Sequence, residues 1–163
     1  MLIKTARHAA AALALVLCAA PAAQAQTATQ TVTFAVNAIN QIAFTGAPSL
    51  TITTAVAGSA PTSVSDATAR WAVTTNQTGA NISASIPANM PTGLTLSVAL
   101  AAPAAATSTG AKALSTTSAS LVTGVTKLAQ GSLTATYTLD ATAAAGVIPS
   151  ATTIVTYTIA GGT

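Results

Sequence analysis

Apolar residues recur at every second position along most of this chain, and rarely at every third or fourth. Successive side chains of a β-strand point to opposite faces, so this period buries one set and exposes the threonines, serines and alanines between them. Seven stretches show the alternation clearly: residues 32–36, 50–56, 71–73, 82–86, 94–100, 133–139 and 155–159. Two weaker stretches are residues 39–44 and 121–125. The pattern therefore predicts about seven to nine short strands.

Turn-forming residues separate these stretches. Glycine, proline and asparagine cluster at residues 46–49, 58–61, 76–79 and 89–93, and these residue types suit turns. The alanine-rich residues 101–106 and 141–145 are not expected to form helices, because Pro103 interrupts the first and the second is shorter than the roughly 12 residues that an isolated helix needs. We expect an all-β chain folded as an antiparallel β-sandwich, Ig-like or jelly-roll-like, with residues 101–111 as its longest irregular stretch.

Residues 1–25 follow the pattern of a secretory signal peptide. Lys4 and Arg7 precede an uninterrupted apolar run at positions 9–20, and Ala23-Gln24-Ala25 places small residues beside a cleavage point. As a helix the run spans about 18 Å, short of the roughly 30 Å hydrocarbon core of a membrane. We expect residues 1–25 to be removed, leaving residues 26–163 as one secreted domain without a transmembrane helix, in the periplasm, on the cell surface or outside the cell.

Ionisable side chains are scarce in residues 26–163. The charged ones are Arg70, Lys112, Lys127, Asp66 and Asp140. Three separated cations cannot form a basic stripe, which excludes nucleic acid as a partner. His8 and Cys18, the only histidine and cysteine, lie in the signal segment. Their removal excludes histidine acid–base catalysis, thiol nucleophiles, thiolate metal sites and disulfides.

Asp66 and Asp140 form the only possible pair of carboxylates for hydrolysis. Asp66 lies in a turn-like entry to a strand and Asp140 ends one, and an aspartate in such a place commonly accepts hydrogen bonds from nearby backbone. We therefore expect a protein that is not an enzyme, with no catalytic, metal or cofactor-binding residues and no cofactor.

Aromatic residues supply two further expectations. Tyr137 and Tyr157 occupy matching positions in the two short motifs Tyr-Thr-Leu and Tyr-Thr-Ile. This echo predicts a closing hairpin with both tyrosines packed in the core, and a ligand-binding face is the alternative. Trp71 is interpreted as a core residue, since sandwiches often pack around one tryptophan. An exposed Trp71 could stack on a sugar, which makes it a candidate ligand-face residue.

The ending Tyr157-Thr158-Ile159 resembles the C-terminal strands of bacterial WxL-like and fimbrial-subunit-like domains. The resemblance covers little more than residues 134–163. Trp71-Ala72-Val73 is a loose, mid-chain version of the Trp-x-Leu motif, and the disulfide usual in chaperone-assembled pilins is missing. The resemblance implies a secreted β-protein of the cell surface and no particular site residues.

Residues 29–37 form a strand-like segment whose Val32, Phe34 and Val36 share one face. Extended at about 3.3 Å per residue, the segment reaches about 30 Å and can pair with an open sheet edge of a neighbour, although pairing within its own chain is the commoner outcome. The charges that usually protect strand edges are nearly absent.

We predict a non-enzymatic structural protein of the bacterial cell surface or of an extracellular fibre, forming a homo-oligomer or filament by exchange of this N-terminal strand. The alternative is a monomeric adhesin or binding module for a glycan or cell-wall polymer. A small outer-membrane β-barrel is a minor alternative, because the few aromatic side chains (Phe34, Phe44, Trp71, Tyr137 and Tyr157) do not suffice for two aromatic girdles.

Overall fold

The computed structural model describes residues 24–163. The predicted signal segment, residues 1–25, therefore lies outside the described residues except for its last two positions. The chain divides into one unit that ends at Ala35 and a folded body from Val36 to Thr163. Residues 24–35 form neither helix nor strand.

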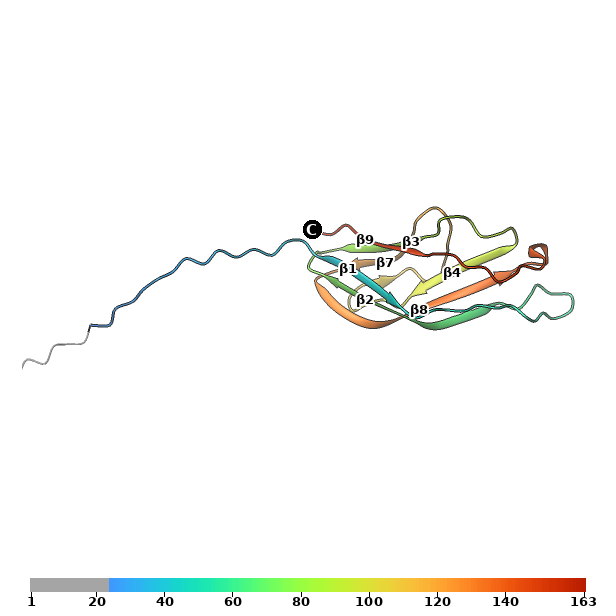
Figure 1. Cartoon of the computed structure of the whole chain (residues 1–163), viewed down its shortest axis with the longest axis horizontal. Helices are drawn as coiled ribbons and strands as arrows, with labels where there is room; N and C mark the ends of the chain where they lie inside the picture. Colours follow the sequence, from blue (N-terminus) through green and yellow to red (C-terminus); the bar gives the residue numbers. More distant parts are fainter. Residues whose placement is uncertain (1–23) are drawn as a thin grey trace, which may run out of the picture. The chain divides into compact units, whose positions relative to one another are not determined.

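The body consists of two antiparallel sheets, which confirms the predicted all-β sandwich (Figure 1). The five-stranded sheet has the order β1-β2-β8-β4-β6, with β1 Asn40–Thr45, β2 Val64–Thr75, β8 Leu128–Ala141, β4 Leu94–Leu100 and β6 Lys112–Ala113. The four-stranded sheet has the order β5-β7-β3-β9, with β5 Thr107–Ser108, β7 Ala119–Val125, β3 Ala80–Ser85 and β9 Thr156–Ala160. A single turn of 3-10 helix, η1 Ala143–Ala145, lies between β8 and β9. No helix within residues 24–163 has the length and apolar character to cross a membrane.

The core lies between the two sheets and follows the alternation of the sequence. Trp71 and Val73 of β2, Val98 of β4 and Ile82 of β3 are buried, while the residues between them on each strand are more exposed. The long strands β2 and β8 pair over most of their length with two irregularities, between Asp66 and Ala69 and between Trp71 and Val73.

Three sequence-based expectations about strands were wrong. Residues 32–36 form no strand, and residues 50–56 make only an isolated bridge between Ala55 and Pro61. The longest irregular stretch of the body is residues 46–63, because residues 101–111 contain β5 at Thr107–Ser108. Next to Leu50, the Ser49 backbone N–H donates a hydrogen bond to the Asp66 side chain of β2. A continuous ladder between this part of the chain and β2 does not form.

The predicted tyrosine hairpin was also wrong. β8 pairs with β2 and β4, whereas β9 pairs with β3 in the other sheet. The two tyrosines nevertheless meet, because their strands face each other across the sandwich, and the hydroxyl oxygens of Tyr137 and Tyr157 lie 2.5 Å apart.

Candidate functional site

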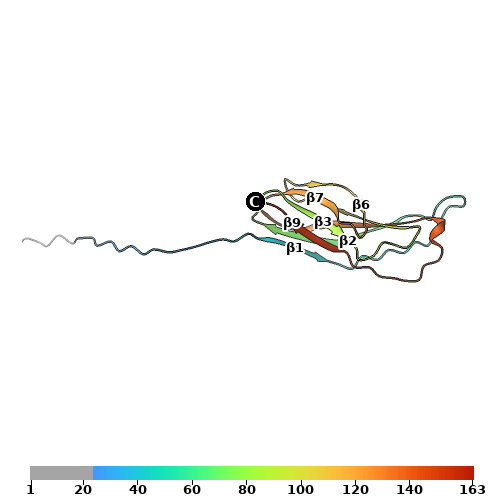
Figure 2. The ribbon, with the colours of Figure 1, turned by 90° about the horizontal axis from the view of Figure 1, so that it is seen from above.

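Two sheet edges face each other at one side of the body without forming a ladder. β1 pairs only with β2, and β9 pairs only with β3. Figures 1 and 2 both show β1 and β9 side by side. Where they come together, the Asn40 side-chain amide donates to the Gly161 carbonyl at 3.3 Å. Each of these strands therefore leaves one edge without strand pairing in the part of the chain that the structure describes.

A groove of about 770 Å³ opens between these two edges. One wall continues from β1 through Pro48 to Leu50, and the other is the approach to β9. The floor comes from the inner side of the five-stranded sheet, and the turn between β3 and β4 also lines the groove. The lining residues are Ile42, Phe44, Pro48, Leu50, Ala88, Asn89, Met90, Pro91, Leu96, Tyr137, Leu139, Ala151, Thr152, Thr153, Val155 and Tyr157. No charged side chain lines the groove among the described residues.

Aromatic rings join the two sheets at this groove. The Phe44 ring stacks on Tyr157 with centroids 3.8 Å apart and on Trp71 with centroids 6.1 Å apart. Burial raises the pKa of Tyr157, and the neighbouring Tyr137 raises it further. Burial also raises the pKa of Tyr137, and the hydrogen bond from Tyr157 opposes this shift. Both phenols therefore stay neutral at physiological pH and act as hydrogen-bonding groups on an apolar floor.

Asp66 fixes one wall of the groove. Its carboxylate accepts hydrogen bonds from the Thr68 hydroxyl at 2.6 Å, the Thr68 backbone N–H at 2.7 Å and the Ser49 backbone N–H at 2.9 Å. The hydroxyl bond from Thr68, followed by the two backbone bonds, lowers the pKa of Asp66. Ser49 lies between Pro48 and Leu50, so this carboxylate anchors the wall to β2.

The two aspartates accept hydrogen bonds from different partners. The contacts of Asp66 are those of a backbone cap, as the sequence suggested. Asp140 accepts a hydrogen bond from the Ser63 hydroxyl. No cluster of three or more histidine, cysteine, aspartate or glutamate side chains suited to a metal occurs within residues 24–163.

The four residues singled out from the sequence differ in how exposed their side chains are. Val32, Phe34 and Val36 are 71%, 89% and 79% exposed and belong to no strand. Trp71 is 1% exposed and belongs to the core. The possibility that Trp71 offers a stacking platform for a sugar is therefore corrected, because its inward strand position places the indole between the sheets. Its ring nitrogen has no hydrogen-bond partner among the described residues.

The groove itself was missed from the sequence. The repeated Tyr-Thr pattern did mark two of its residues, Tyr137 and Tyr157, but as partners in one sheet. The groove lies beside two strand edges that do not pair with each other, and nothing in the local sequence indicates this. Both β1 and β9 show the ordinary alternation of apolar and polar residues.

Comparisons with known proteins give no match: no protein-family model, no curated protein and no solved structure is similar to this chain. Function is therefore inferred from the groove and from the exposed segment alone.

Proposed function

We propose that this protein is a secreted, non-enzymatic structural subunit that assembles by strand exchange. Residues 29–37 of one copy occupy the groove between β1 and β9 of the next copy. One observation carries the proposal: the same chain exposes an alternating apolar segment and has a groove without charged side chains beside the unpaired edges of β1 and β9. Repetition of this contact builds a filament, because each copy has one segment and one groove.

The three apolar side chains of the segment fit within the length of the groove. The wall from Ala151 to Tyr157 spans about 20 Å in extended form, and Val32 to Val36 spans about 13 Å. All three apolar anchors therefore fit within one groove. The segment's backbone would pair with an unpaired stretch of one groove wall, as in other cases of strand addition.

The groove also fits the alternation of the segment. With Val32, Phe34 and Val36 turned toward the floor, Thr31, Thr33 and Ala35 face solvent. Full burial of an exposed valine or phenylalanine contributes about 1.5–3 kcal/mol each, which offsets part of the cost of ordering and association. No charged residue lies within residues 29–37 or in the groove lining to oppose their contact.

A glycan-binding module is the second candidate. The groove volume falls in the range of small-molecule pockets, roughly 300–1,000 Å³, and two phenol hydroxyls line it. Those hydroxyls are bonded to each other, however, and the indole of Trp71 is buried. An extended apolar segment is the better match for this lining.

Electron microscopy and size-exclusion analysis of protein beginning at Gln26 test the proposal. We expect filaments or a ladder of oligomers, and their loss when residues 26–38 are deleted. Monomers from both proteins would overturn strand exchange and favour the binding module.

A pair of point variants separates specific docking from general stickiness. Phe34→Asp places a charge on the face that enters the groove and should abolish assembly. Thr33→Asp, the adjacent change on the opposite face, should leave assembly largely intact. Equal losses in the two variants would contradict docking of this face.

A further inference from the structure

We infer that Asn76 is a positioning residue that keeps the N-terminal segment out of its own groove and so directs it to a second copy. This inference rests on the proposed function. A segment joined directly to β1 would otherwise be captured by the groove next to it, because an intramolecular partner has a high effective concentration.

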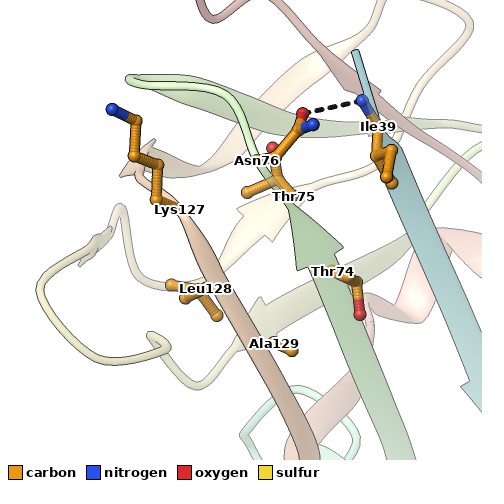
Figure 3. A pocket seen from close by; sticks show the side chains of 7 residues that line it. All are labelled: Ile39, Thr74, Thr75, Asn76, Lys127, Leu128 and Ala129. Carbon is orange, nitrogen blue, oxygen red and sulfur yellow. Dashed lines mark hydrogen bonds between the residues drawn. The ribbon is translucent and has the colours of Figure 1, made fainter. Parts of the chain in front are cut away.

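The Asn76 side chain bonds the chain immediately before β1 through both its oxygen and its amide group. Figure 3 shows the bond to Ile39. The side-chain oxygen accepts the Ile39 backbone N–H at 2.8 Å, and the side-chain amide donates to the Asn37 carbonyl at 2.7 Å. The Asn76 backbone N–H also donates to the Ile39 carbonyl at 3.2 Å. A fourth contact, from the Gln77 side-chain amide at 2.6 Å, orients the Asn76 oxygen.

These contacts extend β1 in its own direction. The ladder pairs Asn40 with Thr75, the last residue of β2, and the next pair along this line is Ile39 with Asn76. The Ile39 side chain adds an apolar contact, since it borders a shallow depression formed with Thr74, Leu128 and Ala129. Residues 37–39 thus continue the line of β1 beyond the end of β2.

Entry into the chain's own groove requires the opposite path. The groove lies along β1 from Ile42 onward, so residues 32–36 can reach it only if the chain reverses between Asn37 and Asn40. A two-residue hairpin turn needs positive φ at one or both central residues, which favours glycine or asparagine. The central residues would be Ala38 and Ile39, and a β-branched residue rarely adopts positive φ. The reversal would also break both side-chain bonds from Asn76.

Disulfide trapping in the full mature chain distinguishes the two paths. Residues 26–163 contain no cysteine, so Val155→Cys in the groove wall can be paired with Val32→Cys or Val36→Cys while Phe34 is retained. In this background we expect cross-links between copies, seen as a ladder in non-reducing electrophoresis. Adding Asn76→Ala should raise the ratio of intramolecular to intermolecular cross-links by about tenfold, as expected for the loss of two hydrogen bonds.

The matched control is Asn81→Ala. Asn81 is exposed and its side chain accepts a hydrogen bond from the Gly124 N–H at 3.4 Å, and within the described residues no hydrogen bond joins it to residues 37–39. This variant should leave the ratio unchanged. Asn76→Asp keeps the oxygen that accepts from Ile39 and loses the amide that donates to Asn37, so it should give an intermediate ratio. Trp71 fluorescence verifies that each variant is folded.

The outcomes separate the two proposals. Intermolecular cross-links that are equally abundant in all variants would overturn the role of Asn76 and leave strand exchange standing. Intramolecular cross-links in the unaltered Asn76 background would overturn the role of Asn76 and also the exchange itself. Failure of both cysteine pairs to cross-link in folded protein would overturn docking in the groove and the inference with it.

Discussion

We expect Asp66 to make the stability of the protein depend on pH in acid. Hydrogen bonds from Thr68 and Ser49 lower its pKa below the ordinary value of 3.8. A carboxyl group with a lowered pKa in the folded state contributes stability above the unfolded-state pKa, and this contribution is lost as the pH falls through the folded-state pKa. We expect Tm, followed by circular dichroism, to fall as the pH drops below about 4, and to fall less in Asp66→Asn.

Thr68→Val provides a check on the cause of this pH dependence. It removes the hydroxyl donor that contributes most to the lowered pKa. The acid-dependent fall in Tm should then shrink in the same direction as in Asp66→Asn. Parallel pH profiles for all three proteins would show that Asp66 does not set the acid response.

The hydroxyl pair of Tyr137 and Tyr157 couples the two sheets at the groove floor. Tyr157→Phe or Tyr137→Phe leaves one partly buried hydroxyl without its partner, and each should lower the free energy of unfolding by about 1 kcal/mol. The double variant should lose less than the sum, because it removes both partners. Denaturation monitored through Trp71 measures all four proteins, and strictly additive losses would contradict the coupling.

The same pair predicts a loss of stability in alkali. Both tyrosines have raised pKa values in the folded protein. Unfolded tyrosines ionise near pH 10, so the unfolded state releases protons there while the folded state holds them. The free energy of unfolding should fall as the pH rises above about 10, and the double Phe variant should show a smaller fall.

At the scale of elements, Gly93 joins the start of β4 to η1. Its φ is +84°, and a Cβ built there would lie 2.5 Å from the Ala145 backbone nitrogen. The Gly93 carbonyl also accepts the Thr142 N–H at 2.8 Å. Gly93→Ala must therefore displace η1, which precedes the groove wall, and should lower the free energy of unfolding by about 2–4 kcal/mol.

Gly79→Ala is the matched control for Gly93→Ala. Gly79 also has positive φ, +77°, but a Cβ there meets nothing within 4 Å. Backbone strain alone predicts a loss of about 1–2 kcal/mol. Equal losses in urea denaturation would argue against the close approach of η1 to Gly93.

The alternation of apolar and polar residues predicted which faces of the strands are buried. It was a poorer guide to which strands pair with each other. Residues 71–73 and 94–100 became parts of β2 and β4 with the expected residues in the core. Residues 50–56 have the same alternation, yet they form no named strand: Leu50 lines the groove and Ala55 makes an isolated bridge to Pro61. Period-two spacing states which side of a segment is apolar, and not which strand it will pair with. The same limit applies to the N-terminal segment with Val32, Phe34 and Val36. Their spacing does not tell whether the segment would pair with its own chain or with another copy.

At the scale of the whole molecule, the body has a core that does not include the N-terminal segment. Within residues 24–163, every buried apolar residue of the core lies at Ala69 or later in the chain. Removal of residues 26–38 therefore leaves the core residues in place and the groove empty. The truncated protein should remain folded, with Trp71 fluorescence typical of a buried indole, and should accept a segment supplied from outside.

A synthetic peptide with the sequence of residues 29–37, Thr-Gln-Thr-Val-Thr-Phe-Ala-Val-Asn, tests this acceptance directly. A ligand that binds only the folded state stabilises it by about 2.7 kcal/mol at 100 times its Kd, so Tm of the truncated protein should rise with peptide concentration. A control peptide with Thr33 and Phe34 exchanged has the same composition, but it turns the phenyl ring away from the other two anchors and should raise Tm far less. Under the strand-exchange proposal, the protein that begins at Gln26 should stop assembling when the first peptide is present in excess, because each peptide occupies a groove and carries none of its own. Equal effects of both peptides would show that apolar content, and not alternation, governs binding.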